Sequence, residues 1–498
     1  MSNLNKLKER FSELKKFKYI NNLLQWDQQV YMPDGSIQDR SSLIELISKI
    51  SHKRLISNKT KVLINKAEKI NDLNLIDSAI FREAKREYEK AIKIPTDLVI
   101  EIAKTSILGH DAWKKARNKK KFTIFKPFLA KMIELQKEYA DRLDIGQSRY
   151  DTLLDDYEPG ATSEWISKIF NYLSKHIKEI LNKLKNSAEK LDQSILKKKY
   201  DPKKQWEFSL EIIKTLGFNF NIGRQDKSTH PFTVSLSPND VRITTRILES
   251  FLPACLFGSI HECGHALYDM GFMKAIHNTN LAGGASLGFH ESQSRLWENI
   301  IGKSKEFWHY WYPKLQELFP ENLKNYSEDN FYKSINSVKP SLIRVEADEV
   351  TYSLHIILRF EIENLIFNDK VEVSELPQLW NEKTETLLDL KIPDDSKGIL
   401  QDVHWSGGAF GYFPTYCLGN LYAAQLYDSI LKKDLVLKEK ISNGNFLDLL
   451  NYLKKDVHQY GRIYHPKELI KKITGKNLNP DYYIDYLKQK YYQIHSIN

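Results

Sequence analysis

The chain has 498 residues, enough to bury a large core, and only 37 of them are glycine or proline (21 Gly and 16 Pro). So few turn residues favour long helices over a many-stranded β-protein. The net charge is +10, but the lysines are spread along the chain among 64 acidic residues. The densest lysine clusters lack interleaved aromatic residues, so we expect no nucleic-acid partner.

Cysteine content and hydropathy indicate the compartment. Three cysteines, an odd number, do not suggest a disulfide framework and indicate a reducing environment. The N-terminal segment is charged throughout and lacks the apolar core of a secretory signal. The longest uncharged stretch, residues 405–427, is too polar to span a bilayer, which takes about 20 mostly apolar residues. We therefore expect a cytoplasmic protein that makes no membrane contact.

Helical periodicity runs through much of the chain. Residues 129–143, 165–184 and 350–367 carry apolar side chains at i, i+3, i+4 and i+7 spacing, which predicts amphipathic helices. No repeat of fixed period and no Gly/Ser-rich or Pro-rich linker interrupts the sequence. The simplest organisation is a mainly α protein that forms a single continuous domain over residues 1–498.

One region departs from the helical pattern. Residues 232–237 and 241–246 alternate between apolar and polar side chains, and Pro238-Asn239-Asp240 separates them. This arrangement predicts a β-hairpin. The edge strand of a small sheet could hydrogen-bond an extended peptide substrate. A hairpin with a purely structural role explains the pattern equally well.

The segment after the hairpin, His261-Glu262-Cys263-Gly264-His265, has the spacing of a zinc site on a helix. His261 and His265 are four residues apart, so both imidazoles project from one helix face. A catalytic zinc takes three protein ligands and keeps one position open for water. Glu262 can reach that water as general base. Cys263 points away from the histidines and is predicted to be a small buried residue.

A third ligand is available downstream. Glu291, in His290-Glu291-Ser292-Gln293, follows a Gly-rich loop and would complete a site of two histidines and one glutamate. An ordinary surface glutamate on an amphipathic helix explains this position as well. Asp269 lies on the histidine face one turn beyond His265. It could accept the second ring N–H of a ligand histidine, or be an exposed residue of the last helical turn.

Two later clusters are unusual for an ordinary helical protein. Residues 343–352 are rich in charged groups, and residues 398–416 are rich in glycine, aromatic and hydrogen-bonding side chains. The second composition is typical of a pocket wall, although a charged helical turn and a packed aromatic core explain the two clusters equally well. The residue chemistry indicates a metal-dependent hydrolase and no narrower activity.

Taken in order, these clusters resemble the signatures of the thermostable-type metallocarboxypeptidases, the carboxypeptidase Taq family. The resemblance extends over nearly the whole chain. The six signatures are His230-Pro231-Phe232, Asp240-x-Arg242-x-Thr244, His261-Glu262-x-x-His265, His290-Glu291-Ser292-Gln293, Ile343-Arg344-x-x-Ala347-Asp348-Glu349-x-x-Tyr352 and Gly398-x-x-Gln401-Asp402-x-His404-Trp405.

The resemblance implies a helical zincin-type domain with a deep substrate groove, a small sheet near the metal, and a homodimer. It implies release of single C-terminal amino acids from peptides with broad specificity, by a metal-bound water that Glu262 activates. One divalent metal per subunit is expected, with zinc first and cobalt or manganese as alternatives. The implied site comprises the metal ligands His261, His265 and Glu291, the oxyanion donors His404 and Tyr416 or Tyr412, and the substrate-binding residues Arg344, Arg242 and His230.

Three other functions stay open from the residues alone. An endo-acting oligopeptidase could use the same metal centre, and a nucleic-acid-binding module is a weaker alternative. A non-catalytic helical scaffold could have kept the metal site, although the intact Glu262 argues against it. The discriminating feature is an arginine for the terminal carboxylate, because arginine binds carboxylates bidentately. The resemblance implies that Arg344 has this role, with Arg242 as the second candidate.

Overall fold

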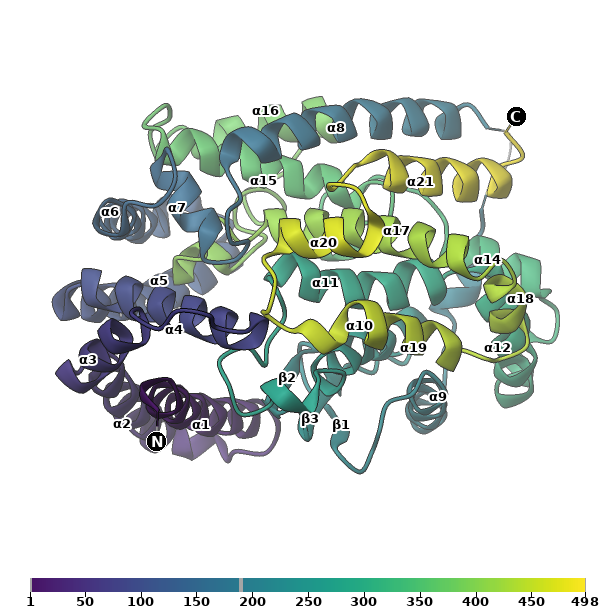
Figure 1. Cartoon of the computed structure of the whole chain (residues 1–498). Helices are drawn as coiled ribbons and strands as arrows, with labels where there is room; N and C mark the ends of the chain where they lie inside the picture. The colour runs from purple at the N-terminus through teal and green to yellow at the C-terminus, as the bar shows by residue number, and fades with distance from the viewer. Residues whose placement is uncertain (1, 188–190, 498) are drawn as a thin grey trace. The chain divides into compact units, whose positions relative to one another are not determined.

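The structure is a computed structural model that describes residues 2–187 and 191–497. Helices dominate it, and one three-stranded sheet is present among the described residues (Figure 1). The mainly α fold with a small sheet is therefore confirmed. The chain forms two compact units, each assembled from three segments. Unit 1 comprises Met1–Ile92, Leu191–Ile335 and Tyr422–Leu478, and unit 2 comprises Lys93–Lys190, Asn336–Leu421 and Asn479–Asn498.

Unit 1 contains the sheet and the predicted metal helix. That helix, α10, has Pro253 in its first turn and ends at Gly271, as the sequence indicates. Helix α11 packs against it. The helices of this unit are α1 (Asn3–Val30), α2 (Ile37–Leu55), α3 (Asn58–Ala67), α4 (Leu75–Lys93), α9 (Pro202–Thr215), α10 (Leu252–Met270), α11 (Leu287–Arg295), the π-helix η5 (Leu296–Ile301), α12 (Lys305–Leu318), α13 (Pro320–Leu323), α14 (Glu328–Ile335), α18 (Leu437–Ser442), α19 (Leu447–Asp456) and α20 (Pro466–Thr474).

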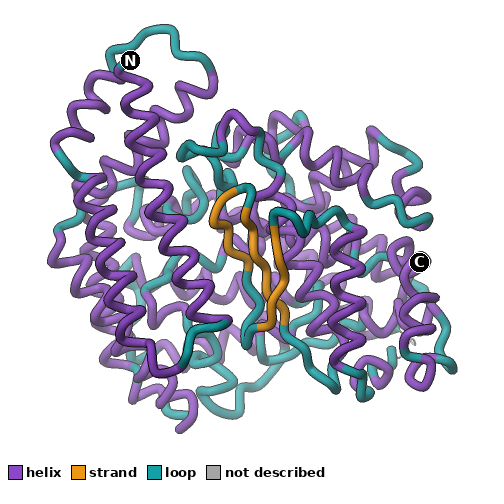
Figure 2. The backbone as a smooth tube through the Cα atoms, turned by 90° about the horizontal axis from the view of Figure 1, so that it is seen from below, coloured by secondary structure: helices purple, strands orange, loops and turns teal. Residues whose placement is uncertain are grey.

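The sheet, orange in Figure 2, has three strands in the order β1-β3-β2. Strands β2 (Thr233–Ser237) and β3 (Asp240–Thr245) pair antiparallel, which confirms the predicted hairpin. Strand β1 (Gly223–Lys227) pairs parallel with β3 and was not predicted, because its polar sequence shows no alternation. Helix α10 packs against β3 and β2, and α1 packs against β2. The sheet therefore adjoins the helix that carries the histidines.

Unit 2 contains the helices that the apolar periodicity predicted most clearly. Helix α8 buries its apolar stripe from Ile166 to Leu184, and α6 and α15 cover the other two periodic segments. Helix α17 (Pro414–Lys433) begins in unit 2 and ends in unit 1. The helices of unit 2 are α5 (Thr96–Lys119), α6 (Lys126–Leu143), α7 (Arg149–Asp155), α8 (Ser163–Lys185), α15 (Tyr352–Phe367), α16 (Leu376–Leu388) and α21 (Asp481–Ile494).

Two further properties concern the cysteines and the hydropathy of the helices. Cys255, Cys263 and Cys417 are buried free thiols, and Cys263 is a small core residue as predicted. Within the described residues, none of the helices has both the length and the apolar character that crossing a membrane requires.

Candidate metal centre

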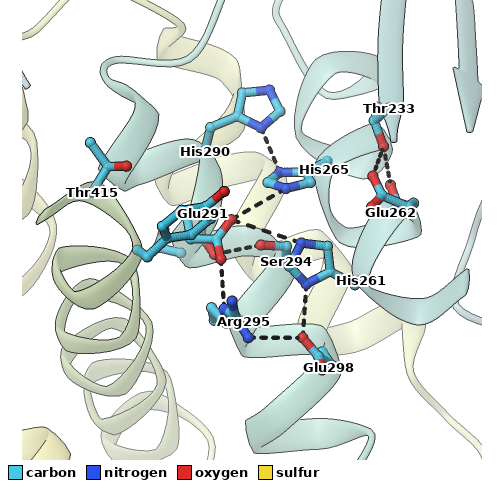
Figure 3. A network of polar contacts seen from close by, with 12 residues as sticks. Thr233, His261, Glu262, His265, His290, Glu291, Ser294, Arg295, Glu298 and Thr415 are labelled. Atoms are coloured by element: carbon cyan, nitrogen blue, oxygen red, sulfur yellow. Dashed lines mark hydrogen bonds and ion pairs between the residues drawn. The ribbon is translucent and has the colours of Figure 1, made fainter. Parts of the chain in front are cut away.

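Gly264 lets α11 come close enough to α10 for a carboxylate to face the two histidines. A Cβ at this position would lie 2.6 Å from the carbonyl oxygen of Gln293 and 2.7 Å from Cα of Ser294. Both of these are backbone atoms that cannot turn aside. Only glycine therefore permits this approach, and it places Glu291 of α11 opposite the histidine face of α10 (Figure 3).

His261, His265 and Glu291 converge on one point. Their candidate ligand atoms all lie within 4.8 Å of one another. Oε2 of Glu291 lies 3.8 Å from Nε2 of His261 and 3.5 Å from Nε2 of His265. A tetrahedral metal with bonds of about 2.1 Å holds its ligand atoms about 3.4 Å apart. The three side chains therefore fit a single divalent metal with little movement.

The first histidine is oriented by a carboxylate that the sequence analysis missed. Nδ1 of His261 donates to Oε2 of Glu298 over 2.8 Å, which leaves Nε2 with a lone pair for the metal. Arg295 and Lys303 lie 3.3 Å and 3.6 Å from the Glu298 carboxylate. Burial opposes ionisation of Glu298, but Lys303 and Arg295 hold its pKa well below the usual range. Its position seven residues after Glu291 is a signal that could have revealed it, because that spacing repeats a helix face.

The second histidine is oriented by another histidine. Nδ1 of His265 lies 2.6 Å from Nδ1 of His290, and Nε2 of His290 lies 3.2 Å from Oδ1 of Asp269. The predicted direct bond from a ligand histidine to Asp269 is therefore wrong. Asp269 contacts His290, whose ring lies between Asp269 and His265. The hydrogen bonds assign the protons: Nε2–H of His290 donates to the carboxylate, so Nδ1 of His290 accepts from His265.

The electrostatics suit a cation held between the Glu291 carboxylate and the two histidine rings. Arg295 donates to Oε1 of Glu291 over 2.6 Å, which leaves Oε2 facing the histidines. Burial opposes ionisation of Glu291, yet Arg295 and the histidines hold its pKa far below the usual value. Burial lowers the pKa of His265 to about 4, so its ring is neutral at physiological pH. A neutral imidazole is the form that binds a metal.

Glu262 lies between the metal ligands and the sheet. The hydroxyl of Thr233, the first residue of β2, lies 2.6 Å from Oε2 of Glu262 (Figure 3). Burial raises the pKa of Glu262, and the neighbouring His261 and this hydrogen bond counter the effect only in part. A buried carboxylate with a raised pKa is suited to accept and release a proton.

Two substrate-binding candidates of unit 1 have other surroundings. Arg242 binds Asp240 through two hydrogen bonds of 2.9 Å, and its guanidinium lies 4.2 Å from the ring of Trp26. It therefore joins α1 to the sheet, because residues two apart on a strand share one face, and its role in binding the substrate carboxylate stays a prediction. His230 is exposed, and its carbonyl accepts from the Ser228 hydroxyl. Its role in binding substrate stays a prediction.

In unit 2, Arg344 belongs to a buried cluster of two arginines and one aspartate. Nε and Nη2 of Arg344 donate to Oδ1 of Asp402 over 3.1 Å and 2.9 Å, and Nη1 donates to the Tyr352 hydroxyl over 3.0 Å. Nε of Arg359 donates to Oδ2 of the same Asp402 over 2.7 Å. Burial opposes ionisation of Asp402, but Arg359 and Arg344 hold its pKa well below the usual range. Two guanidinium groups therefore share one carboxylate.

The predicted oxyanion donors also belong to unit 2. The His404 ring packs against the rings of Tyr412 and Phe413, whose centroids lie 5.4 Å and 4.6 Å from its own. The hydroxyls of Tyr416 and Tyr412 are 3.4 Å apart. Nδ1 of His404 lies 3.9 Å from Oδ1 of Asp402, beyond hydrogen-bond range. Burial lowers the pKa of His404 to about 4, so the ring is neutral near pH 7.

The fold and the site together define a class of protein. A mainly helical chain with two histidines on one helix turn, a glutamate between them and a second glutamate on the adjacent helix is a zincin-type metallopeptidase. The comparisons with known proteins agree. The family model described as carboxypeptidase Taq (M32) metallopeptidase matches residues 6–491.

Individual relatives extend the match over the full length. The chain is 40% identical over 488 residues to carboxypeptidase 1 of Bacillus subtilis, covering 97% of each chain. It is 38% identical to thermostable carboxypeptidase 1 of Pyrococcus furiosus, covering 95% of each. The crystal structure of the M32 carboxypeptidase from Deinococcus radiodurans superposes with a TM-score of 0.97 at 34% identity and full coverage of both chains. This chain therefore belongs to the carboxypeptidase Taq (M32) family and is a metallocarboxypeptidase, a hydrolase of peptides.

Proposed function

We propose that this metallocarboxypeptidase releases single amino acids from the C-terminus of peptides with broad specificity, using a metal held by His261, His265 and Glu291. Zinc suits two imidazoles and a carboxylate, and cobalt or manganese fit the same donors. The observation that carries the proposal is the pair of arginines, Arg344 and Arg359, that share one buried carboxylate.

Glu262 is the proposed general base. When bound, the metal supplies Lewis-acid chemistry that lowers the pKa of a water molecule and polarises the scissile carbonyl. Glu262 takes the proton of the attacking water and passes it to the leaving amine. The raised pKa of its buried carboxyl supports this role, because an acid that stayed fully ionised could not deliver the proton. The Thr233 hydroxyl holds the carboxylate in place.

Arg344 is the proposed anchor for the terminal carboxylate of the substrate. Arg344 and Arg359 place two guanidinium groups on the single carboxylate of Asp402, so the cluster has an excess of positive charge. Leaving a charge unpaired in the interior is costly, and a peptide carboxylate balances it with charge-assisted hydrogen bonds. Arg344 is the accessible member of the pair, at 6% exposed against 0% for Arg359.

The proposed oxyanion donors are His404 and one of two tyrosines. Negative charge develops on the carbonyl oxygen, and donors placed there in advance stabilise it. The neutral ring of His404 keeps one N–H that can donate. The hydroxyls of Tyr412 and Tyr416 are within reach of each other, so either of them can turn toward the oxyanion while the other supports it.

The remaining features of the proposal concern the whole protein. We propose a cytoplasmic homodimer whose chain forms a single continuous catalytic domain over residues 1–498, with a deep substrate groove. The buried free thiols support a reducing compartment, and the family resemblance supports the dimer and the groove. The substrates are peptides with a free C-terminal carboxylate, and we propose no nucleic-acid or membrane partner.

A mixed peptide pool tests the activity directly. The protein is incubated with the pool, with and without a metal chelator, and the products are identified by mass spectrometry. We expect ladders shortened one residue at a time from the C-terminus, and their loss when chelator is present. Internal fragments in place of ladders would favour an endo-acting oligopeptidase.

Arg344→Ala tests the anchor. Because a buried charge pair is broken, we expect kcat/KM for a free-carboxylate peptide to fall by about a hundredfold, while the matched C-terminally amidated peptide loses little. Arg344→Lys keeps the charge but not the paired hydrogen bonds. Its kcat/KM for the free-carboxylate peptide should lie between the values of wild type and Arg344→Ala. Circular dichroism and metal content serve as folding controls. An equal loss of kcat/KM on the free and amidated peptides would contradict this role of Arg344.

A further inference from the structure

The buried carboxylate of Glu349 is surrounded by donors from a single helix of unit 2. Glu349 is 5% exposed. Its Oε1 accepts from the Tyr486 hydroxyl over 2.9 Å, and its Oε2 accepts from Nζ of Lys490 over 2.8 Å and from the Tyr491 hydroxyl over 2.9 Å. The Tyr483 hydroxyl donates to the main-chain carbonyl of Glu349 over 3.0 Å. All four donors belong to α21.

Glu349 lies at one end of the segment that carries Arg344. Arg344 opens a short 3-10 helix, and Glu349 follows just before α15 begins. At the other end, Oε1 of Gln401 accepts from the main-chain N–H of Arg344 over 2.9 Å. Between the two ends, the Asp348 carboxylate accepts from the N–H of Thr351 over 3.0 Å and from its hydroxyl over 2.7 Å. The main chain around Arg344 is therefore tied on both sides.

These bonds supply geometry more than stability. A buried ion pair such as Lys490 with Glu349, 2.8 Å apart, stabilises a fold no better than apolar side chains of the same volume. Three directional bonds to the carboxylate and one to the main-chain carbonyl, however, define where Glu349 lies, which apolar contacts alone do not. Three of the four donors are buried, because Tyr483, Lys490 and Tyr491 are 1%, 8% and 1% exposed.

We infer that Glu349 is a positioning residue through which α21 sets the place of Arg344 at the substrate carboxylate. Glu349 touches neither substrate nor metal in this role. The inference rests on the proposed function of Arg344 as anchor and assigns to α21, at the far end of the sequence, a part in recognising the end of the peptide. A small displacement of an anchoring group is enough to weaken binding strongly.

The test compares Glu349→Gln with Tyr492→Phe. The glutamine keeps the side-chain volume but turns an amide NH2 toward the donors of α21. Tyr492 is the matched control, because it directly follows Tyr491 on α21 and Nζ of Lys183 lies 5.0 Å from the centroid of its ring. For Glu349→Gln we expect KM of a free-carboxylate peptide to rise about tenfold with kcat little changed. Cleavage of the amidated peptide and metal content should match those of wild type. Tyr492→Phe should leave the cleavage of both peptides unchanged.

Tyr491→Phe gives a second, milder variant that removes one donor and leaves Lys490 in place. We expect KM of the free-carboxylate peptide to rise about threefold. The inference is therefore still tested if Glu349→Gln does not fold. No change, or an equal loss on the free and amidated peptides, would overturn it. If Arg344→Ala separates the two peptides and the Glu349 variants do not, the positioning role alone fails. If Arg344→Ala does not separate them, the proposed anchor fails first.

Discussion

The metal centre of unit 1 and the arginine cluster of unit 2 carry opposite excess charges. Three carboxylates, those of Glu262, Glu291 and Glu298, lie beside two cations, Arg295 and Lys303. In unit 2 the proportions are reversed, with two guanidinium groups on one carboxylate. The first cluster therefore has an excess of carboxylates, which suits a bound cation, and the second has an excess of guanidinium groups, which suits a bound carboxylate.

The two clusters also differ in how they are assembled. The metal centre uses two adjacent helices, and its residues lie close together in the sequence, from His261 to Glu298. The arginine cluster joins Arg344, Arg359 and Asp402 from three separate elements. Local spacing therefore reveals the first cluster, while the second exists only when distant segments are folded together. Perturbations of the first should act on metal or proton transfer, and those of the second on substrate binding.

The largest expected effect comes from Glu262→Gln. Removing the general base should lower kcat by about a thousandfold, while the metal affinity stays close to that of wild type because glutamine keeps the shape and the Thr233 contact. Steady-state kinetics together with metal analysis measure both. A variant that binds metal and cleaves peptides at the wild-type rate would show that the proposed mechanism is wrong.

Gly264→Ala should separate α10 from α11. The added methyl meets backbone atoms of Gln293 and Ser294 at 2.6 Å and 2.7 Å, so the helices must shift and Glu291 moves from the histidines. We expect metal affinity to fall by about a hundredfold, measured by competition with a chelating dye. Gly258→Ala on the same helix is the control, since its nearest contacts are at 3.7 Å. Unchanged affinity in Gly264→Ala would refute the close-packing argument.

Glu298→Gln should weaken metal binding more mildly, by about tenfold. The amide can still accept from Nδ1 of His261, but it no longer increases the basicity of the ring. Isothermal titration with zinc measures the change, and the free-to-amidated substrate ratio should stay constant because Arg344 is untouched. A shift in that ratio would mean that the two clusters are not functionally separate.

A separate effect, on stability and not on catalysis, depends on pH. Glu363 is fully buried and accepts from Trp405, Gly411 and Tyr150; burial raises its pKa to about 7. A folded-state pKa raised above the unfolded value means that stability is present at low pH and is lost as pH rises. Between about pH 4.5 and 7, the free energy of unfolding of wild type should fall by up to about 3 kcal/mol relative to that of Glu363→Gln. Denaturant unfolding at several pH values measures this difference, and a pH-independent difference would contradict it.

The sequence predicted most of what depends on local pattern. The helix periods, the hairpin from Thr233 to Thr245, and the convergence of His261, His265 and Glu291 all follow from spacing along one or two elements. The contact of Arg344 with Tyr352 also joins residues of one signature.

The features that were missed depend on tertiary pairing. Strand β1 exists because β3 supplies its partners, and its own residues show no strand pattern. His290 lies between His265 and Asp269 because of the way α11 packs on α10. A helical wheel of α10 alone cannot show this packing. The pairing of Arg242 with Asp240, in contrast, is a local contact on one strand, and it was not predicted.

Gly264 has a consequence for anyone who would transplant this metal site into another scaffold. The distance between the two helices is set by backbone meeting backbone, so the ligand carboxylate does not depend on how bulky side chains settle between them. Copying the two histidines and the glutamate onto another helix pair would leave the carboxylate too distant. The small residue at the crossing point has to be copied with them, although it binds nothing.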